Sequence, residues 1–279
     1  MTDIIAEIGS SHNGSKDTAL RLIEYAAEAG CDYAKFQLFT GDDLWHSSDS
    51  RLEATRRLAL PVEWLPDLKN HCLDYGIRFL CTPFSLKAVD ALEDLGVKAY
   101  KISSGDITYL PLIKRVGETV KKVFLSVGAA TYAEIDAALS EMPKSDVTLL
   151  HCIPGYPVLP AHANLTKILD LTQRYTLRNG GLDREFPVGL SSHLREYYVD
   201  AAAVLYRVAV IEKHIDLPGR PGPEGPHSLE PDELTLFVTM VRDIELAMQS
   251  HSEFTEEETY ARENYRRNQK DWLRPAGRN

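Results

Sequence analysis

Short apolar segments alternate with longer helical segments along most of the chain, and this alternation limits the possible folds more than any other feature. Each short segment is rich in β-branched or aromatic residues, and the segment after it carries apolar residues at helical spacing. The eight expected strands are Asp3–Ile8, Cys31–Leu38, Arg78–Thr82, Ala99–Ile102, Lys122–Val127, Val147–His151, Phe186–Leu190 and Val208–His214. Eight strand–helix units in roughly 250 residues is the usual size of a closed barrel.

The same alternation predicts a parallel sheet, because a parallel crossover requires a helix. A polar loop is expected between Leu38 and Pro61, and the expected helices are Thr18–Ala29, Pro61–Tyr75, a helix capped by Ser85, Leu110–Val116, Tyr132–Glu141, Asn164–Tyr175, Tyr197–Tyr206 and Pro231–His251. An open sheet with a nucleotide loop is disfavoured, since no GxGxxG, GxxxxGKS or GxxxxGKT motif follows a strand. We predict an α/β protein with a (β/α)8 TIM barrel as a single domain over residues 1–251, followed by a charged helical tail over residues 252–279.

Charge and cysteine content restrict the partners and the compartment. The 279 residues include 31 Lys and Arg against 41 Asp and Glu, a formal net charge of -10. Nucleic acids and anionic membranes are polyanions, so this balance argues against both as partners. The four cysteines, which are Cys31, Cys72, Cys81 and Cys152, show no CxxC spacing and are expected to be reduced core thiols. With neither a leader sequence nor an apolar run of about 20 residues, we expect a cytoplasmic protein.

Polar residues stand at the carboxyl ends of the expected strands, where barrels of this kind place their active sites. Two of them, Lys35 and Lys101, are lysines inside otherwise apolar strands. A buried ammonium group needs an anionic partner. That partner is either a strand carboxylate such as Glu7 or Glu212, or the phosphate or carboxylate of a ligand. In the second case, serine hydroxyls at neighbouring strand ends complete an anion cradle, and these are Ser104, Ser126 and Ser191.

Two histidines end successive strands, so their rings are expected to converge at one rim. These are His193 and His214. Neutral imidazoles suit a divalent metal such as Mn²⁺, Zn²⁺ or Fe²⁺, and two of them leave positions for water and substrate. The alternative is a pair of hydrogen-bonded core histidines. His12 and His151 are candidates for acid–base groups near neutral pH.

Several segments, taken in order along the chain, resemble one family. They are AEIGSSHNG (6–14), AKFQLF (34–39), TPFSLKAVDALEDLGVKAYKISSGDI (82–107), LSVGAAT (125–131), LLHCIPGYP (149–157), VGLSSH (188–193), IEKHI (211–215) and PGPEGPHSLEPDEL (221–234). Together they look like the catalytic barrel of the N-acetylneuraminate (sialic acid) synthase family, also called NeuB-like. Members of that family condense phosphoenolpyruvate with an aldose, giving a 2-keto-3-deoxy sugar acid and phosphate in a metal-dependent reaction.

The resemblance implies a role for each matching residue. The positions that bind phosphoenolpyruvate are Lys35, Lys101, Ser104, Ser126 and Ser191. His193 and His214 match the metal-binding histidines, with Mn²⁺ the usual ion and Mg²⁺ or Co²⁺ as alternatives. The positions at or near the sugar are Gln37, Asp106, Tyr156 and Glu224. The catalytic candidates are His193, His214, Asp106 and Glu212, and the sequence does not rank Asp106, Glu212 and Glu224 as the group that orients water or sugar hydroxyls.

The chain also departs from the family pattern. Asp106 stands where many relatives have Glu, and Glu224 stands where Asp is common. Asn13 replaces a catalytic Glu found in some members, and Pro154 replaces a polar residue. Relatives usually carry a C-terminal antifreeze-like domain that reaches over the partner's active site in a homodimer. The chain stops at Asn279, so we expect that domain to be absent, with N-acetylmannosamine or another sugar aldehyde as the acceptor.

Three functions are compatible with these observations. The first is a phosphoenolpyruvate-dependent sugar-acid synthase, with phosphoenolpyruvate and a sugar aldehyde as ligands and a homodimer implied by the resemblance. The second is a metal-dependent barrel aldolase or isomerase that does not use phosphoenolpyruvate. The third is a non-catalytic sugar-binding subunit that depends on a partner.

Overall fold

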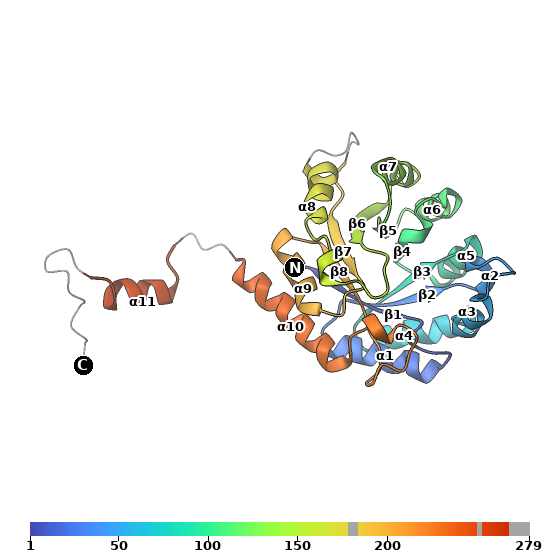
Figure 1. The fold of residues 1–279 in the computed structure, drawn as a ribbon, viewed down its shortest axis with the longest axis horizontal. Coiled ribbons are helices and arrows are strands. Elements are labelled where there is room, and N and C mark those ends of the chain that lie inside the picture. The colour runs from blue at the N-terminus through green and yellow to red at the C-terminus, as the bar shows by residue number, and fades with distance from the viewer. Residues whose placement is uncertain (178–183, 250–252, 268–279) are drawn as a thin grey trace. The chain divides into compact units, whose positions relative to one another are not determined.

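Eight parallel strands form one sheet that closes into a barrel (Figure 1). The computed structural model describes residues 1–177, 184–249 and 253–267. The strands are β1 (Asp3–Gly9), β2 (Tyr33–Leu38), β3 (Arg78–Pro83), β4 (Ala99–Ile102), β5 (Lys122–Ser126), β6 (Asp146–Cys152), β7 (Val188–Ser192) and β8 (Val210–His214). Hydrogen-bonded neighbours run in the order β3-β2-β1-β8-β7-β6-β5-β4, and β3 contacts β4, which completes the circle. The predicted barrel is confirmed.

The helices surround the strands, as Figure 1 shows for the barrel. They are α1 (Lys16–Glu28), α2 (Gly41–Leu44), α3 (Leu52–Leu58), α4 (Leu65–Asp74), α5 (Leu86–Leu95), α6 (Leu110–Gly117), α7 (Tyr132–Ser140), α8 (Lys167–Thr172), α9 (Tyr197–Ala201) and α10 (Pro231–Ala247). A further helix, α11 (Glu256–Asn264), belongs to the C-terminal segment. The segment expected to be a polar loop after β2 contains α2 and α3. Helix α10 ends at Ala247, before the expected end at His251, which lies outside the described residues.

Side-chain caps define where several helices begin. Ser85 Oγ accepts a hydrogen bond from the backbone N–H of Ala88 at 3.3 Å, at the start of α5. Thr131 and Glu134 form a reciprocal capping box at the start of α7. Such caps satisfy backbone donors that have no partner within the helix. The turns from strand to helix are therefore fixed close to the strand ends that carry the polar residues.

An apolar layer fills the inside of the barrel on the amino-terminal side of the polar strand ends. Its members are Ile5, Tyr33, Leu80, Ala99, Phe124, Leu150 and Val210, each at most 5% exposed. They come from seven of the eight strands, and each points inward. Side chains alternate between the two faces of a strand, so the next inward-facing residue stands two positions further along. This layer is the base on which the polar residues rest.

Strand β7 contributes a glycine to this layer instead of a side chain. A Cβ at Gly189 would lie 2.6 Å from Val210 Cγ1 and 2.7 Å from Leu150 Cδ2. Real Cβ atoms do not approach other heavy atoms so closely, so the neighbouring side chains occupy the space that a larger residue would need. The glycine allows β6, β7 and β8 to pack at this level of the barrel.

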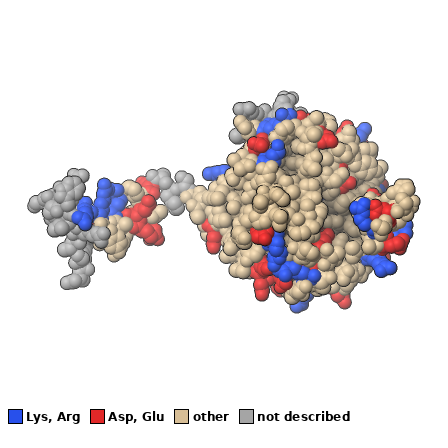
Figure 2. All heavy atoms as spheres, in the orientation of Figure 1, with Lys and Arg blue, Asp and Glu red and all other residues tan. Residues whose placement is uncertain are grey.

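The chain separates by its contacts into a unit of residues Met1–Ile244 and a unit of residues Glu245–Asn279. The expected boundary at 251/252 falls outside the described residues. In the second unit, α11 has no buried residue. Acidic and basic side chains are interspersed on the visible face of the barrel unit, next to a broad uncharged area (Figure 2). No helix within the described residues is long and apolar enough to cross a membrane, and the four cysteines are buried and unpaired with one another.

Candidate functional site at the carboxyl ends of the strands

A cavity of about 440 Å³ opens at the carboxyl ends of the strands. Its base consists of residues two positions beyond the apolar layer, as Lys35 follows Tyr33 and Lys101 follows Ala99. The period of two along each strand therefore places a polar layer directly on an apolar one. The predicted site residues that line the cavity are Lys35, Gln37, Lys101, Ser104, Ser126, Tyr156, Ser191, His193, Glu212, His214 and Glu224.

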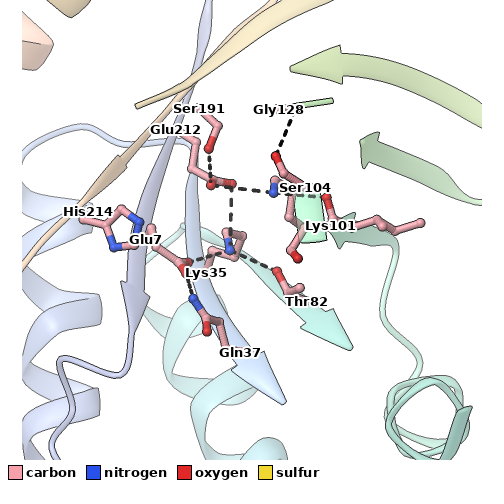
Figure 3. A network of polar contacts seen from close by, with 12 residues as sticks. Glu7, Lys35, Gln37, Thr82, Lys101, Ser104, Gly128, Ser191, Glu212 and His214 are labelled. Carbon is pink, nitrogen blue, oxygen red and sulfur yellow. Dashed lines mark hydrogen bonds and ion pairs between the residues drawn. The ribbon is translucent and has the colours of Figure 1, made fainter. Parts of the chain in front are cut away.

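Lys35 lies at the centre of a buried network on the cavity floor (Figure 3). Its Nζ is 2.7 Å from Glu7 Oε2 and 3.8 Å from Glu212 Oε2, and it donates to Thr82 Oγ1 at 3.0 Å. Burial opposes the charge on this ammonium group, but the attraction of Glu212 and Glu7 is stronger and raises the pKa of Lys35. Lys35 is therefore a fixed cation.

Lys101 has fewer partners than Lys35. Its Nζ is 3.8 Å from Glu212 Oε1 and donates to the carbonyl of Ile102 at 3.2 Å. Burial lowers the pKa of Lys101, and Glu212 only partly offsets this effect. The pairing of both lysines with strand carboxylates was one of the two alternatives left by the sequence. Because both lysines also line the cavity, the two alternatives are compatible.

Two carboxylates balance the two lysines, and their surroundings differ. Burial of Glu212 raises its pKa, but Lys101 and Lys35 act more strongly and bring the pKa of Glu212 down to about 2. Glu212 Oε1 also accepts a hydrogen bond from Ser191 Oγ at 2.9 Å. Burial raises the pKa of Glu7, whose Oε1 accepts from Gln37 Nε2 at 2.6 Å. Glu212 is thus the fixed anion, and Glu7 is the carboxylate more easily protonated.

The three predicted serines differ in what they are bonded to. Ser191 donates to Glu212, and Ser104 Oγ accepts from the backbone N–H of Gly128 at 3.0 Å. Ser126 Oγ is buried and has no hydrogen-bond partner within the described part of the chain. Since a buried hydroxyl normally finds a partner, Ser126 is placed to donate to a ligand in the cavity.

His193 and His214 also line the cavity, and His227 packs against both rings from outside the lining. His214 Nδ1 is 2.8 Å from Glu224 Oε2, and His193 Nδ1 is 2.9 Å from the carbonyl of Ile153. Burial lowers the pKa of His193 and of His227 to about 3 in each case, which keeps both rings neutral. Neutral imidazoles whose Nδ1 is held by an oxygen are oriented to bind a metal through Nε2.

A cluster able to hold a metal is present at this rim. One ligand atom from each of His214, Glu224 and His227 lies within 4.8 Å of the others. The predicted partner His193 stands beside it, with its ring centroid 5.1 Å from that of His214. The chemistry of this donor set fits a divalent metal. Its two histidines are His214 and His227, so it differs from the predicted pair of His193 and His214.

Close packing fixes the position of Glu224. Gly9 ends β1 with a φ of +48°, and a Cβ on it would lie 2.4 Å from Glu224 Oε2. The carboxylate also accepts from the backbone N–H of Ser10 at 3.2 Å. The end of β1 therefore holds Glu224 against His214, although 214 residues separate Ser10 from Glu224 in sequence.

Asp106 is not among the residues that line the cavity, but its carboxylate lies close enough to Lys101 for that ammonium group to oppose the rise in pKa that burial causes. It ends a short 3-10 turn (Ser104–Asp106) and accepts a hydrogen bond from Ser103 Oγ at 2.7 Å. Ser104 of this turn lines the cavity, and the hydroxyl of the neighbouring Ser103 holds the Asp106 carboxylate. Ser103, Gly105 and Ser104 line the cavity in its place.

The acid–base candidates His12 and His151 also stand outside the cavity lining. His151 Nε2 is 2.9 Å from the carbonyl of Ala163, and His12 Nδ1 accepts from the backbone N–H of Gly14 at 3.1 Å. Burial lowers the pKa of both rings. Each ring is held by a hydrogen bond to a nearby backbone group.

The predicted sugar-binding residue Tyr156 lines the cavity and packs on the ring of His193, with ring centroids 4.1 Å apart.

No role was predicted for His227, because it lies in a Pro- and Gly-rich loop where no periodicity predicts which side chains are buried. Its place near His214 follows from a 3-10 turn (Gly225–His227) that folds the loop back over the barrel. Thr82 and Cys152 also line the cavity. Their inward direction was available from the alternation along β3 and β6, since each follows a core residue by two positions.

The chain is similar to several known proteins in both sequence and fold. The model of the NeuB family matches residues 22–253. N,N'-diacetyllegionaminic acid synthase from Campylobacter jejuni is 37% identical over 267 residues, which cover 88% of this chain and 77% of that protein. N-acetylneuraminate-9-phosphate synthase from Homo sapiens is 28% identical over 266 residues, covering 88% of this chain and 71% of that protein.

A solved structure shows the same architecture. The N-acetylneuraminic acid synthetase of Leptospira borgpetersenii, determined in complex with citrate, superposes with a TM-score of 0.84 at 30% sequence identity. The match covers 96% of this chain and 93% of that one. The resemblance drawn from the sequence segments is confirmed. This chain belongs to the NeuB family of phosphoenolpyruvate-dependent sugar-acid synthases.

Proposed function

We propose that this chain condenses phosphoenolpyruvate with an N-acylated aldose to give a nonulosonic acid and phosphate. The observation that carries the proposal is the composition of one cavity, in which a floor with two buried lysines faces a rim of buried histidines. Relatives named for N,N'-diacetyllegionaminic acid and for N-acetylneuraminate 9-phosphate support an N-acylated acceptor.

The floor is suited to orienting phosphoenolpyruvate. Lys35 and Lys101 supply positive charge for its phosphate and carboxylate, and Ser126 supplies a free hydroxyl donor. Holding both anionic groups directs the methylene carbon, C3, toward the rim, which lowers the entropy cost of the reaction. C3 forms a bond to the aldehyde carbon of the sugar, water adds at C2, and the C–O bond to phosphate breaks.

The rim is suited to the sugar aldehyde. His193 and His214 are the residues proposed to hold a divalent metal, with Mn²⁺ as the family's usual ion and Mg²⁺ or Co²⁺ to be compared with it. Such an ion supplies Lewis-acid polarisation of the aldehyde. Gln37 and Tyr156 face the remaining sugar hydroxyls, and Glu224 orients His214.

Glu212 is the carboxylate best placed to act near C2 of phosphoenolpyruvate. It contacts both lysines and Ser191, and its low pKa keeps it ionised at neutral pH. Glu224 is engaged by His214 and Ser10, and Asp106 lies outside the cavity lining. We infer that Glu212 orients the attacking water, a choice that the sequence left open among three residues.

An acceptor screen tests the proposed function. The full chain is incubated with Mn²⁺, phosphoenolpyruvate and one aldose at a time, and phosphate release is measured. The panel contains N-acetylmannosamine, its 6-phosphate, a diacetamido hexose and unsubstituted pentoses. The expected result is phosphate release that depends on an N-acylated acceptor. Absence of aldose-dependent phosphate with every acceptor, together with no calorimetric binding of phosphoenolpyruvate, would contradict the proposal.

A matched pair of variants links the activity to the cavity floor. Lys101→Met removes a cavity lysine, and Lys98→Met removes an exposed lysine just before the same strand. We expect Lys101→Met to reduce phosphate release at least about 100-fold, because loss of a charged group from an oriented site costs several kcal/mol. Lys98→Met is expected to retain the wild-type rate.

A lysine-dependent aldolase is the second candidate, and one observation favours it. Burial lowers the pKa of Lys101, which increases the fraction of free amine available for a Schiff base. Borohydride treatment in the presence of each aldose separates the two functions. Covalent trapping at Lys101 without phosphate release supports the aldolase, whereas phosphate release without trapping supports the synthase.

A further inference from the structure

His227 is a buried histidine whose side chain has an unused nitrogen. It is 5% exposed, and its Nε2 has no hydrogen-bond partner within the described residues. Its backbone N–H donates to the carbonyl of Glu224 at 3.2 Å, which fixes the turn that carries it. A buried polar atom without a partner is costly, so its position calls for a specific partner in the cavity rim.

Three imidazole rings face one another at this rim. Their centroids are 5.1 Å apart for His193 and His214, 4.6 Å for His214 and His227, and 5.7 Å for His193 and His227. A tetrahedral ion with metal–nitrogen distances of about 2.0–2.1 Å places the centroids of three bound imidazoles about 5 Å from one another. The rings therefore already have the spacing of a three-histidine site.

The hydrogen bonds of the rings leave the required nitrogens available. Nδ1 of His193 is held by the carbonyl of Ile153, and Nδ1 of His214 is held by Glu224. Nε2 is therefore the nitrogen that His193 and His214 have left for a metal, and Nε2 of His227 is buried with no hydrogen-bond partner within the described residues. The two carboxylate oxygens of Glu224 are taken by Ser10 and His214, so Glu224 acts behind His214 and fixes its orientation.

We propose that His227 is a third imidazole ligand of the metal held by His193 and His214, and that it shifts the site toward nitrogen-preferring ions. This inference rests on the proposed function, because it concerns the same metal site. Imidazole suits Zn²⁺ and Co²⁺, whereas Mg²⁺ and Mn²⁺ favour oxygen ligands. The third ring therefore increases the preference for Co²⁺ over Mn²⁺ beyond that of a two-histidine site.

Metal binding by the full chain, stripped of metal with a chelator, tests the proposal. Co²⁺ affinity is measured from the visible absorption of the bound ion, Mn²⁺ affinity from the loss of the free-ion paramagnetic resonance signal, and the number of imidazole ligands from X-ray absorption of the Co²⁺-loaded protein. The variants are His227→Gln and His227→Phe, the second of which keeps a ring but no ligand atom. The matched control is His151→Gln, a buried histidine outside the cavity lining.

We expect three imidazoles around Co²⁺ in the wild type and two in both His227 variants. Co²⁺ affinity is expected to fall about 10–100-fold, with a smaller loss for Mn²⁺, while the control retains wild-type values. Three imidazoles in His227→Phe, or an unchanged ratio of Co²⁺ to Mn²⁺ affinity in both variants, overturns the proposal. Failure of the proposed function is distinguished by a wild type that binds metal through three imidazoles but releases no phosphate with any acceptor.

Discussion

Lys35 and Lys101 occupy comparable positions on two strands, yet their neighbours give them different charge behaviour. Lys35 contacts Glu7, Glu212 and Thr82, and its pKa is raised. Lys101 has one carboxylate at 3.8 Å, and its pKa is lowered. At the residue scale, Lys35 is thus held in its charged form by its neighbours, whereas Lys101 loses its proton more easily.

Replacing Lys35 with Met tests this anchoring role. The substitution leaves Glu7 and Glu212 buried with less positive charge, so we expect the free energy of unfolding to fall by about 3–5 kcal/mol. Adding Glu7→Gln removes one of the uncompensated charges and is expected to restore most of the stability, but not the binding of phosphoenolpyruvate. Urea denaturation and calorimetry measure the two effects. Restored ligand binding in the double variant would show that Lys35 serves stability alone.

Predictions of the candidate site were most specific for residues on strands, because the alternation along a strand determines which side chains point into the barrel. Lys35, Lys101 and Ser191 point into the cavity because each stands on the inward-facing side of its strand. No such alternation exists for His227 or Asp106, because both lie in turns. The direction of a turn side chain depends on local hydrogen bonds, such as that between Ser103 and Asp106, and these follow from the folded backbone.

At the scale of elements, β7 depends on the glycine at position 189. Gly189→Ala places a Cβ 2.6 Å from both Cγ1 and the carbonyl oxygen of Val210. Since β7 and β8 are hydrogen-bonded neighbours, the strand cannot easily move away. We expect the free energy of unfolding to fall by about 1–3 kcal/mol. Gly105→Ala is the control, because its nearest contact would be 3.6 Å away, and it should be unchanged or slightly more stable in urea denaturation.

The loop that carries Glu224 and His227 is braced by ion pairs to α10. Arg220 donates to Glu233 Oε2 at 2.7 Å and to the carbonyl of Ser228 at 3.2 Å, and Arg195 pairs with the other oxygen of Glu233. Partial burial opposes the charge of Glu233, but hydrogen bonds from Arg195, the backbone of Glu230 and Arg220 lower its pKa to about 2. This carboxylate therefore connects the loop that carries Glu224 and His227 to α10, the helix that follows it.

The stabilising effect of Glu233 is expected to depend on pH. Its folded pKa of about 2 lies below its ordinary value of 4.5, so the contribution is complete above about pH 4.5 and is lost as the pH falls toward 2. Glu233→Gln should lower the free energy of unfolding by about 1–2 kcal/mol at pH 6, with a smaller difference at pH 3. Chemical denaturation at both pH values measures this. An equal difference at both would contradict the ionic origin of the effect.

The elements themselves were largely predictable from periodicity. All eight strands appear where apolar β-branched runs predicted them, and Ser85 caps a helix as expected. Helices α2 and α3 were not predicted, because the first is 4 residues long and the second 7, too short for a clear helical period. Short helices of this kind depend on tertiary contacts more than on their own sequence.

At the scale of the whole molecule, charge is separated between the surface and the cavity. The formal net charge of the chain is -10, and acidic and basic side chains are interspersed on the face shown in Figure 2. The cations proposed to bind phosphoenolpyruvate, Lys35 and Lys101, are 2% and 3% exposed. The net charge of the chain therefore gives no information on the two buried lysines of the cavity, on which the proposed binding of phosphoenolpyruvate depends.

The buried network on the cavity floor has a consequence for the thermodynamics of ligand uptake. Two ammonium groups, Lys35 and Lys101, and two carboxylates, Glu7 and Glu212, already cancel in charge. A phosphate adds a charge of about -1.5 to -2, and the carboxylate of phosphoenolpyruvate adds more. Binding should therefore draw a counter-charge from solution, either a metal ion or a proton, and Glu7, with its raised pKa, is the site for the proton.

Calorimetry of phosphoenolpyruvate binding at neutral pH, without metal and in buffers of different ionisation enthalpy, measures this coupling. We expect the binding enthalpy to vary with the buffer in the direction of proton uptake, and the dependence to decrease in Glu7→Gln. An enthalpy independent of the buffer would show that no proton enters with the ligand. With metal present, the proton uptake should decrease, because the metal ion then compensates the negative charge of the ligand in place of the proton.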